Sequence, residues 1–396
     1  MNADVKNETR SKTYNGLTTL TPGLPATHYY DPAQYELELA RIWYRNWNYV
    51  GRAESFDGPR AYRTVEIGTQ RVIVVRDDQG QLRAFHNTCR HRGAALCTEA
   101  AGRLASAHLV CPYHSWSYSL SGELLRTTSK HLPEEFNRKD FSLYAVALRE
   151  WNGFVFISLA ASPPPFESGF DAPLTRLDSW PMARLRTAHT FSKVMNCNWK
   201  VFWENYNECL HCPTVHPSLS RLVPIFARAL MEEQDDPDWQ AHASSGDPQY
   251  ADPRYKGGLR AGAVTWSRDG QSTVPGFADL PEADRKAGHV YVTILPTMFV
   301  VAHVDYVRTV QLRPLGPERT ELAVEFLVAP ETLTNPDFDL AAIVDFTGEV
   351  MLEDAMVAEL NQQGLHALAH QRGVLMPEEY ALRNFHQWVA AELARP

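Results

Sequence analysis

The sequence is poor in the features that mark membrane-bound, secreted and nucleic-acid-binding proteins. No apolar run approaches the roughly 20 residues that a membrane-spanning helix needs. The polar residues 1–16 lack the apolar segment of a secretory signal, and we therefore expect a cytoplasmic protein. The net charge of −9 gives no reason to expect nucleic acid or a membrane surface as a partner.

Nucleotide-binding signatures are also missing, and cysteine is scarce. Neither the G-x-G-x-x-G pattern of dinucleotide-binding folds nor a P-loop occurs in the chain. The six cysteines are Cys89, Cys97, Cys111, Cys197, Cys209 and Cys212. Disulfides are rare in a reducing compartment, so cysteines grouped near histidines are interpreted as metal ligands.

The length of the chain and the change in its local composition predict more than one domain. A chain of 396 residues exceeds the roughly 100–200 residues of a typical domain. We expect an N-terminal arm and helix over residues 1–47 and a β-rich domain over residues 48–160. A larger mixed domain is expected over residues 161–396, because a proline-rich linker at 161–173 follows the β-rich region and precedes a region of mixed helix and strand patterns.

Local patterns predict the elements within these regions. Residues 1–30 are expected to form a loosely structured arm, and residues 32–48 carry apolar side chains at helical spacing. Short β-rich runs bounded by turn residues predict strands in the second region, at 71–75, 108–113 and 154–159. The third region is expected to hold three strands and a long helix, at 289–304, 306–315, 321–330 and 337–369.

Two cysteine–histidine pairs form the first candidate site. They are Cys89-x-His91 and Cys111-x-x-His114, with 19 residues between His91 and Cys111. Two such pairs on two turns can bring two thiolates and two imidazoles to one point, where they could bind zinc or a Rieske-type [2Fe–2S] cluster. Zinc sites usually pair cysteine with cysteine, which makes the cluster the favoured interpretation. Cys97 lies between the pairs and is interpreted as a buried apolar residue.

A second candidate site lies in NWKVFWENYNECLHCPTVHP, residues 198–217. Glu208, His211 and His216 stand at i, i+3 and i+8, which brings them near one face of a helix that prolines are expected to interrupt. Two histidines with a distant carboxylate fit the facial triad of non-haem iron oxygenases. The pair Cys209-x-x-Cys212 mimics a redox or zinc motif, but no ligand role is assigned to it.

The third ligand of the facial triad is expected from the long C-terminal helix. Asp354 is our choice, with the adjacent Glu353 pointing about 100° away and Glu359 as the next candidate. Without a metal, these acidic residues would form an ordinary solvated face. Asp354 is preferred because the pattern EDxxxxExxQxGL, beginning at Glu353, resembles the ligand-bearing helix of the Rieske oxygenases.

The words CRHRG (89–93) and CPYHSWSY (111–118) also resemble the signature of that family, and the chain as a whole resembles its terminal oxygenase (α) subunit. The resemblance implies an α+β fold, with an all-β Rieske domain followed by a helix-grip domain in which an antiparallel sheet wraps a long helix. It implies that Cys89, His91, Cys111 and His114 hold the [2Fe–2S] cluster. It also implies that His211, His216 and Asp354 hold a mononuclear Fe(II).

The family resemblance further implies a homotrimer, in which the cluster of one subunit lies close to the mononuclear iron of its neighbour. Glu208 would link the two centres and act in electron transfer between them. O₂ would be the co-substrate, and a separate flavin and iron–sulfur reductase would supply electrons from NAD(P)H. A small organic molecule is the expected substrate.

The sequence around Glu208 resembles the members that act on choline, carnitine and betaines, which favours oxidative N-demethylation. Ring dihydroxylation or O-demethylation of an aromatic compound is the alternative, and a pure Rieske electron carrier is a further one. A quaternary ammonium substrate would need aromatic side chains and, if it carries a carboxylate, a basic partner. Arg260 and Arg308 are candidates for that partner. Aromatic candidates are Trp203, Tyr206, Trp266, Tyr291, Phe299 and Tyr306.

Overall fold

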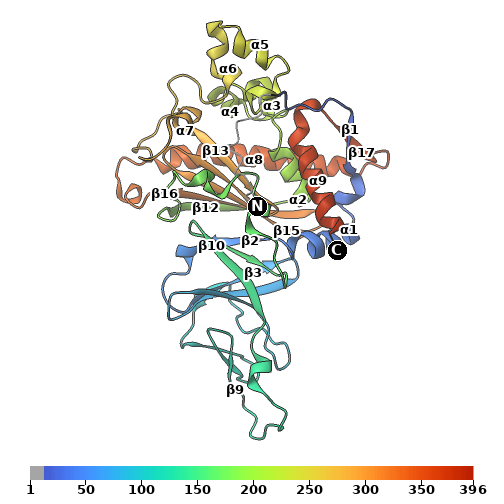
Figure 1. Cartoon of the computed structure of the whole chain (residues 1–396), viewed down its shortest axis with the longest axis vertical. Coiled ribbons are helices and arrows are strands. Elements are labelled where there is room, and N and C mark those ends of the chain that lie inside the picture. Colours follow the sequence, from blue (N-terminus) through green and yellow to red (C-terminus); the bar gives the residue numbers. More distant parts are fainter. Residues whose placement is uncertain (1–12, 396) are drawn as a thin grey trace, which may run out of the picture.

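The computed structural model of the chain describes residues 13–395, so the first part of the expected N-terminal arm lies outside the described residues. Figure 1 shows a β-rich lower part and a larger upper part, in which a sheet is covered by helices. The α+β fold with an N-terminal all-β part is thus confirmed. The boundaries at residues 47 and 160 stay predictions. No helix within the described range is long and apolar enough to span a membrane.

The lower part consists of two antiparallel sheets. A seven-stranded sheet has the order β2-β11-β10-β5-β4-β3-β6, and a three-stranded sheet has the order β7-β8-β9. The predicted strands at 71–75 and 154–159 are confirmed as β4 and β11, whereas β7 ends at Val110, earlier than predicted. The strands are β2 (Asn48–Arg52), β3 (Ala61–Ile67), β4 (Gln70–Arg76), β5 (Leu82–His86), β6 (Ala101–Arg103), β7 (His108–Val110), β8 (Ser117–Ser119), β9 (Leu124–Arg126), β10 (Ala145–Trp151) and β11 (Phe154–Ser158).

The upper part is built on a five-stranded antiparallel sheet with the order β12-β16-β15-β14-β13. The single strand predicted at 289–304 is wrong, because the segment turns at Pro296 and forms the hairpin β13–β14. Proline lacks the amide donor that a continuous strand would need there. The strand bounds are β12 (Arg186–Met195), β13 (His289–Ile294), β14 (Met298–His303), β15 (Val307–Gly316) and β16 (Arg319–Val328).

One long helix, α8 (Leu340–Leu365), lies along this sheet, as the helix-grip fold requires (Figure 1). Its buried residues recur at helical spacing, and Asp354 stands among them on the face directed into the protein. The helix predicted at 337–369 is therefore confirmed within a few residues at each end. The other α-helices are α1 (Pro32–Glu38), α2 (Trp199–Tyr206), α3 (Cys212–Val215), α4 (Pro217–Leu222), α5 (Trp239–Ser244), α6 (Pro253–Lys256), α7 (Glu282–Ala287) and α9 (Tyr380–Ala394).

The N-terminal segment is more ordered than the sequence predicted. Strand β1 (Thr21–Pro25) pairs with β17 (Arg372–Leu375), so residues 21–25 are not part of a loose arm. Helix α1 continues as a π-helical turn over Leu39–Trp43, and β2 begins at Asn48. The helix predicted over 32–48 therefore ends about one turn early. The pairing of β1 with a strand near the other end of the chain has no local signal in the sequence.

A fully buried ion pair ties α1 to α2. Lys200 Nζ lies 2.7 Å from both carboxylate oxygens of Glu38, and both side chains are 0% exposed. Trp199 Nε1 donates to Glu38 over 2.8 Å, and Asn198 Oδ1 accepts from Lys200 over 2.8 Å. Burial lowers the pKa of Lys200, although Glu38 opposes this shift. The pair thereby fixes the start of the helix that leads into the second candidate site.

We expect Glu38→Ala to lower the free energy of unfolding by about 3–5 kcal/mol, because it leaves a buried ammonium without its counter-charge. Glu38→Met with Lys200→Met should recover most of this loss, since no unpaired charge remains. Chemical denaturation followed by circular dichroism measures both. Glu66→Ala, which removes an exposed partner of Arg71, is the matched control and should change little. Equal effects of the two alanine variants would contradict this account.

Candidate metal centres

Two tight turns carry the two cysteine–histidine pairs. The amide of Gly93 donates to the carbonyl of Cys89, and the amide of Ser115 donates to that of Cys111. Gly93 and Ser115 both have positive φ, at 80° and 57°, which lets each chain reverse within four residues. The two turns belong to the lower part of the molecule in Figure 1, the second of them between β7 and β8.

The donor atoms of these turns are arranged in an inner and an outer pair. The thiols of Cys89 and Cys111 are buried, at 3% and 1% exposure, and lie beside each other. His91 and His114 stand further out, with their Nδ1 atoms 3.2 Å apart. This separation into two thiols and two imidazoles fits a Rieske cluster, whose two irons take different ligands. A zinc site would instead draw its four donors around one ion.

Aromatic neighbours hold these ligands in place. The Tyr118 hydroxyl lies 3.2 Å from Cys89 Sγ and accepts from the amide of Arg90. The Trp116 ring stacks on His91, with centroids 4.9 Å apart and planes 10° apart. Cys97 is buried and outside the cluster of donors, as predicted. Burial raises the pKa of its thiol to about 11, which keeps it protonated.

The second site lies where the chain leaves α2. The helix ends at Tyr206, Glu208 falls in the following turn, and His211 stands directly before α3. His216 separates α3 from α4. The predicted interruption by prolines is confirmed, since Pro213 lies in the first turn of α3 and Pro217 begins α4. The chain also leaves the helix before Glu208, so the three residues do not share one continuous helical face. The break nevertheless turns both imidazoles toward α8.

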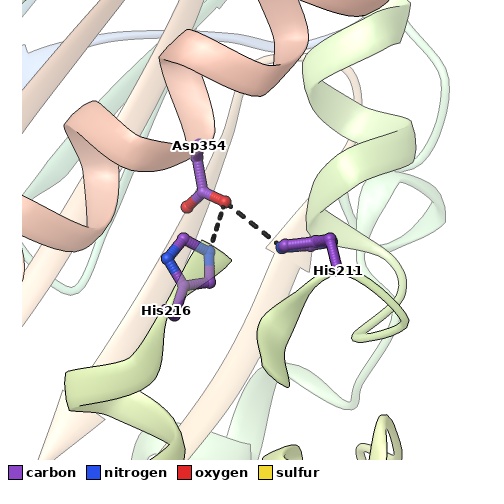
Figure 2. A group of neighbouring side chains, drawn as sticks. All are labelled: His211, His216 and Asp354. Carbon is purple, nitrogen blue, oxygen red and sulfur yellow. Dashed lines mark hydrogen bonds and ion pairs between the residues drawn. The ribbon is translucent and has the colours of Figure 1, made fainter. Parts of the chain in front are cut away.

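Figure 2 shows the resulting arrangement of His211, His216 and Asp354. Asp354 Oδ1 lies 2.9 Å from Nε2 of His216 and 3.4 Å from Nε2 of His211. One donor atom from each of the three residues lies within 4.8 Å of the others. Two imidazoles and one carboxylate on one side of a cavity fit the facial triad of a non-haem iron centre.

Each histidine of the triad is oriented by a second carboxylate. Glu208 Oε1 accepts from Nδ1 of His211 over 2.5 Å, and Glu353 Oε2 accepts from Nδ1 of His216 over 2.7 Å. Both bonds place the proton on Nδ1 and leave Nε2 free to bind a metal. Glu353 is adjacent to Asp354 in the sequence and is expected to point about 100° away from it. Glu353 and Asp354 do point in different directions, but both reach His216: Asp354 lies at Nε2 and Glu353 at Nδ1, on the opposite side of the ring.

The charges at this site suit a divalent cation. Burial lowers the pKa of His211, but hydrogen bonds with Asp354 and Glu208 outweigh it and raise the pKa to about 9. The same carboxylate network raises the pKa of His216, whereas the two imidazoles hold that of Asp354 below its usual range. Three carboxylates around two imidazoles thus supply negative charge that a divalent ion would offset in large part.

The structure joins Cys209 to Cys212 in a disulfide, with Cα atoms 4.9 Å apart. This pairing differs from the expectation that a cytoplasmic chain holds its cysteines reduced. The disulfide brackets Leu210 and His211, and its short loop follows Glu208 directly. The other four cysteines are free thiols.

Beside the triad lies a cavity with an aromatic wall. Four of the six aromatic residues considered from the sequence line it, namely Tyr206, Trp266, Tyr291 and Phe299. Trp203 instead donates from Nε1 to the carbonyl of Pro296, and Tyr306 donates to that of Trp266, so both belong to the packed core. Arg308 lines the same cavity, whereas Arg260 is exposed.

Comparison with known proteins places the two sites in a family. Residues 46–135 match the Rieske [2Fe-2S] domain, and residues 182–395 match the ring hydroxylating alpha subunit (catalytic domain). The glycine betaine monooxygenase oxygenase subunit of Chromohalobacter salexigens is 32% identical over 389 residues, which cover 92% of this chain and 84% of that protein. The chain belongs to the Rieske oxygenases, as an alpha subunit. It is therefore an oxidoreductase, and its two domains imply a Rieske cluster and a mononuclear iron.

Other similar proteins include both branches of the Rieske oxygenases. Choline monooxygenase of Spinacia oleracea is 28% identical, over 93% of this chain and 78% of that protein. The carnitine complex of the quaternary ammonium Rieske monooxygenase CntA has a TM-score of 0.68 at 20% identity, covering 94% of this chain and 96% of that chain. Naphthalene 1,2-dioxygenase from Rhodococcus has a TM-score of 0.69 at 20% identity, covering 94% and 95%. The structural likeness confirms the fold of this Rieske oxygenase.

If the triad holds the mononuclear iron, His211→Ala should lose that iron and leave the cluster spectrum intact. Glu353→Gln should keep the ligand but weaken its orientation, so we expect iron affinity to fall about 10- to 100-fold. Metal analysis and visible absorption of the purified variants measure the two centres separately. Glu359→Gln, which lies on the same helix outside the triad, serves as the control. Full iron occupancy in His211→Ala would disprove the ligand assignment.

Proposed function

We propose that this protein is the terminal oxygenase of a multicomponent system that oxidatively N-demethylates a betaine-like quaternary ammonium compound. Cys89, His91, Cys111 and His114 would hold the cluster, and His211, His216 and Asp354 the iron. When bound, the iron supplies O₂ activation and the cluster supplies one-electron transfer. The protein itself binds the substrate, excludes water and orients the ligands.

The aromatic wall of the cavity beside the triad carries this proposal. Tyr206 and Phe299 stack with centroids 3.9 Å apart, and Tyr291 meets Tyr206 edge to face at 5.9 Å. Aromatic faces attract quaternary ammonium groups through cation–π interactions, most strongly where water is excluded. Burial raises the pKa of Tyr206 and of Tyr291, so both phenols stay neutral and the wall adds no charge of its own. The chain's relatives include enzymes named for glycine betaine and choline.

The proposed reaction balances with O₂ and two electrons. One oxygen atom enters a C–H bond of an N-methyl group, and the other leaves as water with two protons. The N-hydroxymethyl product then releases formaldehyde, a proton and the tertiary amine. We propose that a separate reductase delivers the electrons from NAD(P)H, because the chain has no nucleotide-binding signature of its own.

We further propose that the electrons cross between subunits of a homotrimer. Figure 1 shows β9, the neighbour of the cluster turns in the three-stranded sheet, at the far end of the molecule from α8. A second hollow, of about 320 Å³, lies on the outer side of Glu208 and is lined by Glu204, Glu379 and His386. The cluster end of the chain carries Arg90 and Arg92, whose charges complement these acids. Glu208 would thus join a neighbour's cluster to the iron.

Oxidation of an aromatic ring or of an aryl methyl ether is the second candidate, since the fold is shared with naphthalene 1,2-dioxygenase. The buried cation Arg308 in the cavity argues against a wholly apolar substrate.

The proposed reaction predicts formaldehyde in a fixed ratio to O₂. We would reconstitute the oxygenase anaerobically and add a surrogate reductase, NADH and one compound at a time from a panel of betaines, choline, carnitine and methoxy-aromatics. We expect about one formaldehyde per O₂ from a quaternary ammonium compound. Oxidation of arenes alone, or O₂ uptake without formaldehyde, would contradict N-demethylation.

For Glu208→Gln reconstituted with iron in excess, which offsets a weaker affinity, we expect both metals to be retained while turnover falls by about two orders of magnitude. The amide keeps the shape of the side chain but loses the carboxylate that faces His211. Reduction of the cluster should still occur, followed by slow reoxidation in the presence of substrate and O₂, which stopped-flow absorption resolves. Glu204→Gln, in the same hollow but not against a triad histidine, is the matched control. Normal reoxidation in Glu208→Gln would rule out the bridging role.

A further inference from the structure

The cavity beside the triad contains a cation, Arg308, for which the described residues supply no carboxylate partner. We propose that Arg308 binds the carboxylate of the substrate, so that the substrate is a zwitterionic betaine and not a cationic alcohol such as choline. This inference rests on the proposed function and narrows it, because it separates two substrate classes that share the trimethylammonium group.

Arg308 is buried, and two of its three guanidinium nitrogens lack an acceptor among the described residues. Its side chain is 2% exposed, and its Nε and Nη1 atoms have no hydrogen-bond acceptor within the described residues. Guanidinium groups remain charged in proteins, and burying such a charge without a counter-ion is costly. The other buried cations have acceptors: Lys200 is paired with Glu38, and Arg52 donates to backbone carbonyls, including that of Met182. A ligand anion in the cavity would supply the missing acceptor.

Sheet register directs Arg308 into the site. On β15 it stands opposite Val301 of β14, which in turn stands opposite Tyr291 of β13. Side chains in such a row project from the same face of a sheet, so the guanidinium shares its face with the Tyr291 ring. Both residues line the cavity together with Asp354. Burial raises the pKa of Tyr291. The charges of Arg308 and Asp354 shift this pKa in opposite directions, so the phenol lies near both groups.

The surroundings of Arg308 supply further donors but no counter-charge. Its guanidinium lies 5.7 Å from the ring centroid of Trp266, whose own Nε1 is buried without a partner. His289 and His303 pack against Trp266 at 5.1 and 5.3 Å. Burial and the nearby Arg308 lower the pKa of His289 to about 4 and also lower that of His303, so neither imidazole carries charge at neutral pH. Arg308 and Trp266 line the cavity with donor atoms that no described residue accepts from, and these donors are therefore available to a carboxylate.

The cavity thus has two chemically distinct parts. Tyr206 and Phe299 offer aromatic faces to a cation, and Arg308 offers a charged donor to an anion. A betaine matches both parts with one short molecule, whereas choline presents only a neutral hydroxyl to Arg308. The other basic candidate, Arg260, is exposed and donates to the carbonyl of Asp269, so it does not compete for this role.

The test compares binding of glycine betaine and choline to the anaerobic holoenzyme by isothermal titration calorimetry. We expect wild type to bind glycine betaine more tightly than choline. Arg308→Met should weaken glycine betaine about 10- to 100-fold, as expected for the loss of a charge-assisted hydrogen bond, and change choline less than about twofold. Arg308→Lys retains the charge and should lose less, and it replaces the methionine variant if that variant fails to fold. Arg260→Met is the matched control and should bind both compounds as wild type does.

Two results would overturn the assignment. Wild type could bind choline as tightly as glycine betaine, or the Arg308 variants could weaken both compounds to the same extent, as a purely structural role predicts. Either result leaves N-demethylation intact if formaldehyde is still released. A third combination of results would separate the two proposals. If binding is carboxylate-selective and depends on Arg308, but no quaternary ammonium compound releases formaldehyde, the subsite is supported and the proposed reaction is contradicted.

Discussion

Oδ1 of Asp354 faces the Nε2 atoms of His211 and His216, at 3.4 and 2.9 Å. The three residues come from two chain segments about 140 positions apart, and only the packing of α8 against the sheet and α2 brings them together. Glu208 and Glu353 then fix the two imidazoles from behind. Because these carboxylates place negative charge around the two imidazoles, the fold itself favours a divalent cation at this site.

Glu208 lines both the cavity beside the triad and the second hollow next to it. The cavity beside the triad holds the aromatic wall and Arg308, and the second hollow is lined by Glu204, Glu379 and His386. If a neighbouring subunit docks at the second hollow, as proposed, electrons and substrate approach the triad from different sides. That separation would leave the cavity beside the triad to select its substrate by shape and charge.

The sequence could indicate candidate ligands because the motifs that contain them are local. Cys89-x-His91 and Cys111-x-x-His114 are short motifs on turns, and Asp354 lies in a helical pattern that resembles the ligand-bearing helix of the family. Features that depend on distant partners could not be predicted in this way. The pairing of β1 with β17, the reach of Glu353 to His216 and the isolation of Arg308 all arise from tertiary packing. The turn between β13 and β14 does have a local signal, namely Pro296, but the apolar residues on both sides of it favour one continuous strand.

The central claim is that this chain carries two iron centres of different kinds. It is tested most directly by measuring iron and acid-labile sulfide per chain in the reconstituted protein, before and after mild chelation. The account predicts about three irons and two sulfides, and the loss of about one iron to the chelator while the cluster spectrum persists. Zinc in place of iron at the cysteine pairs, or no iron beyond that of the cluster, would contradict it.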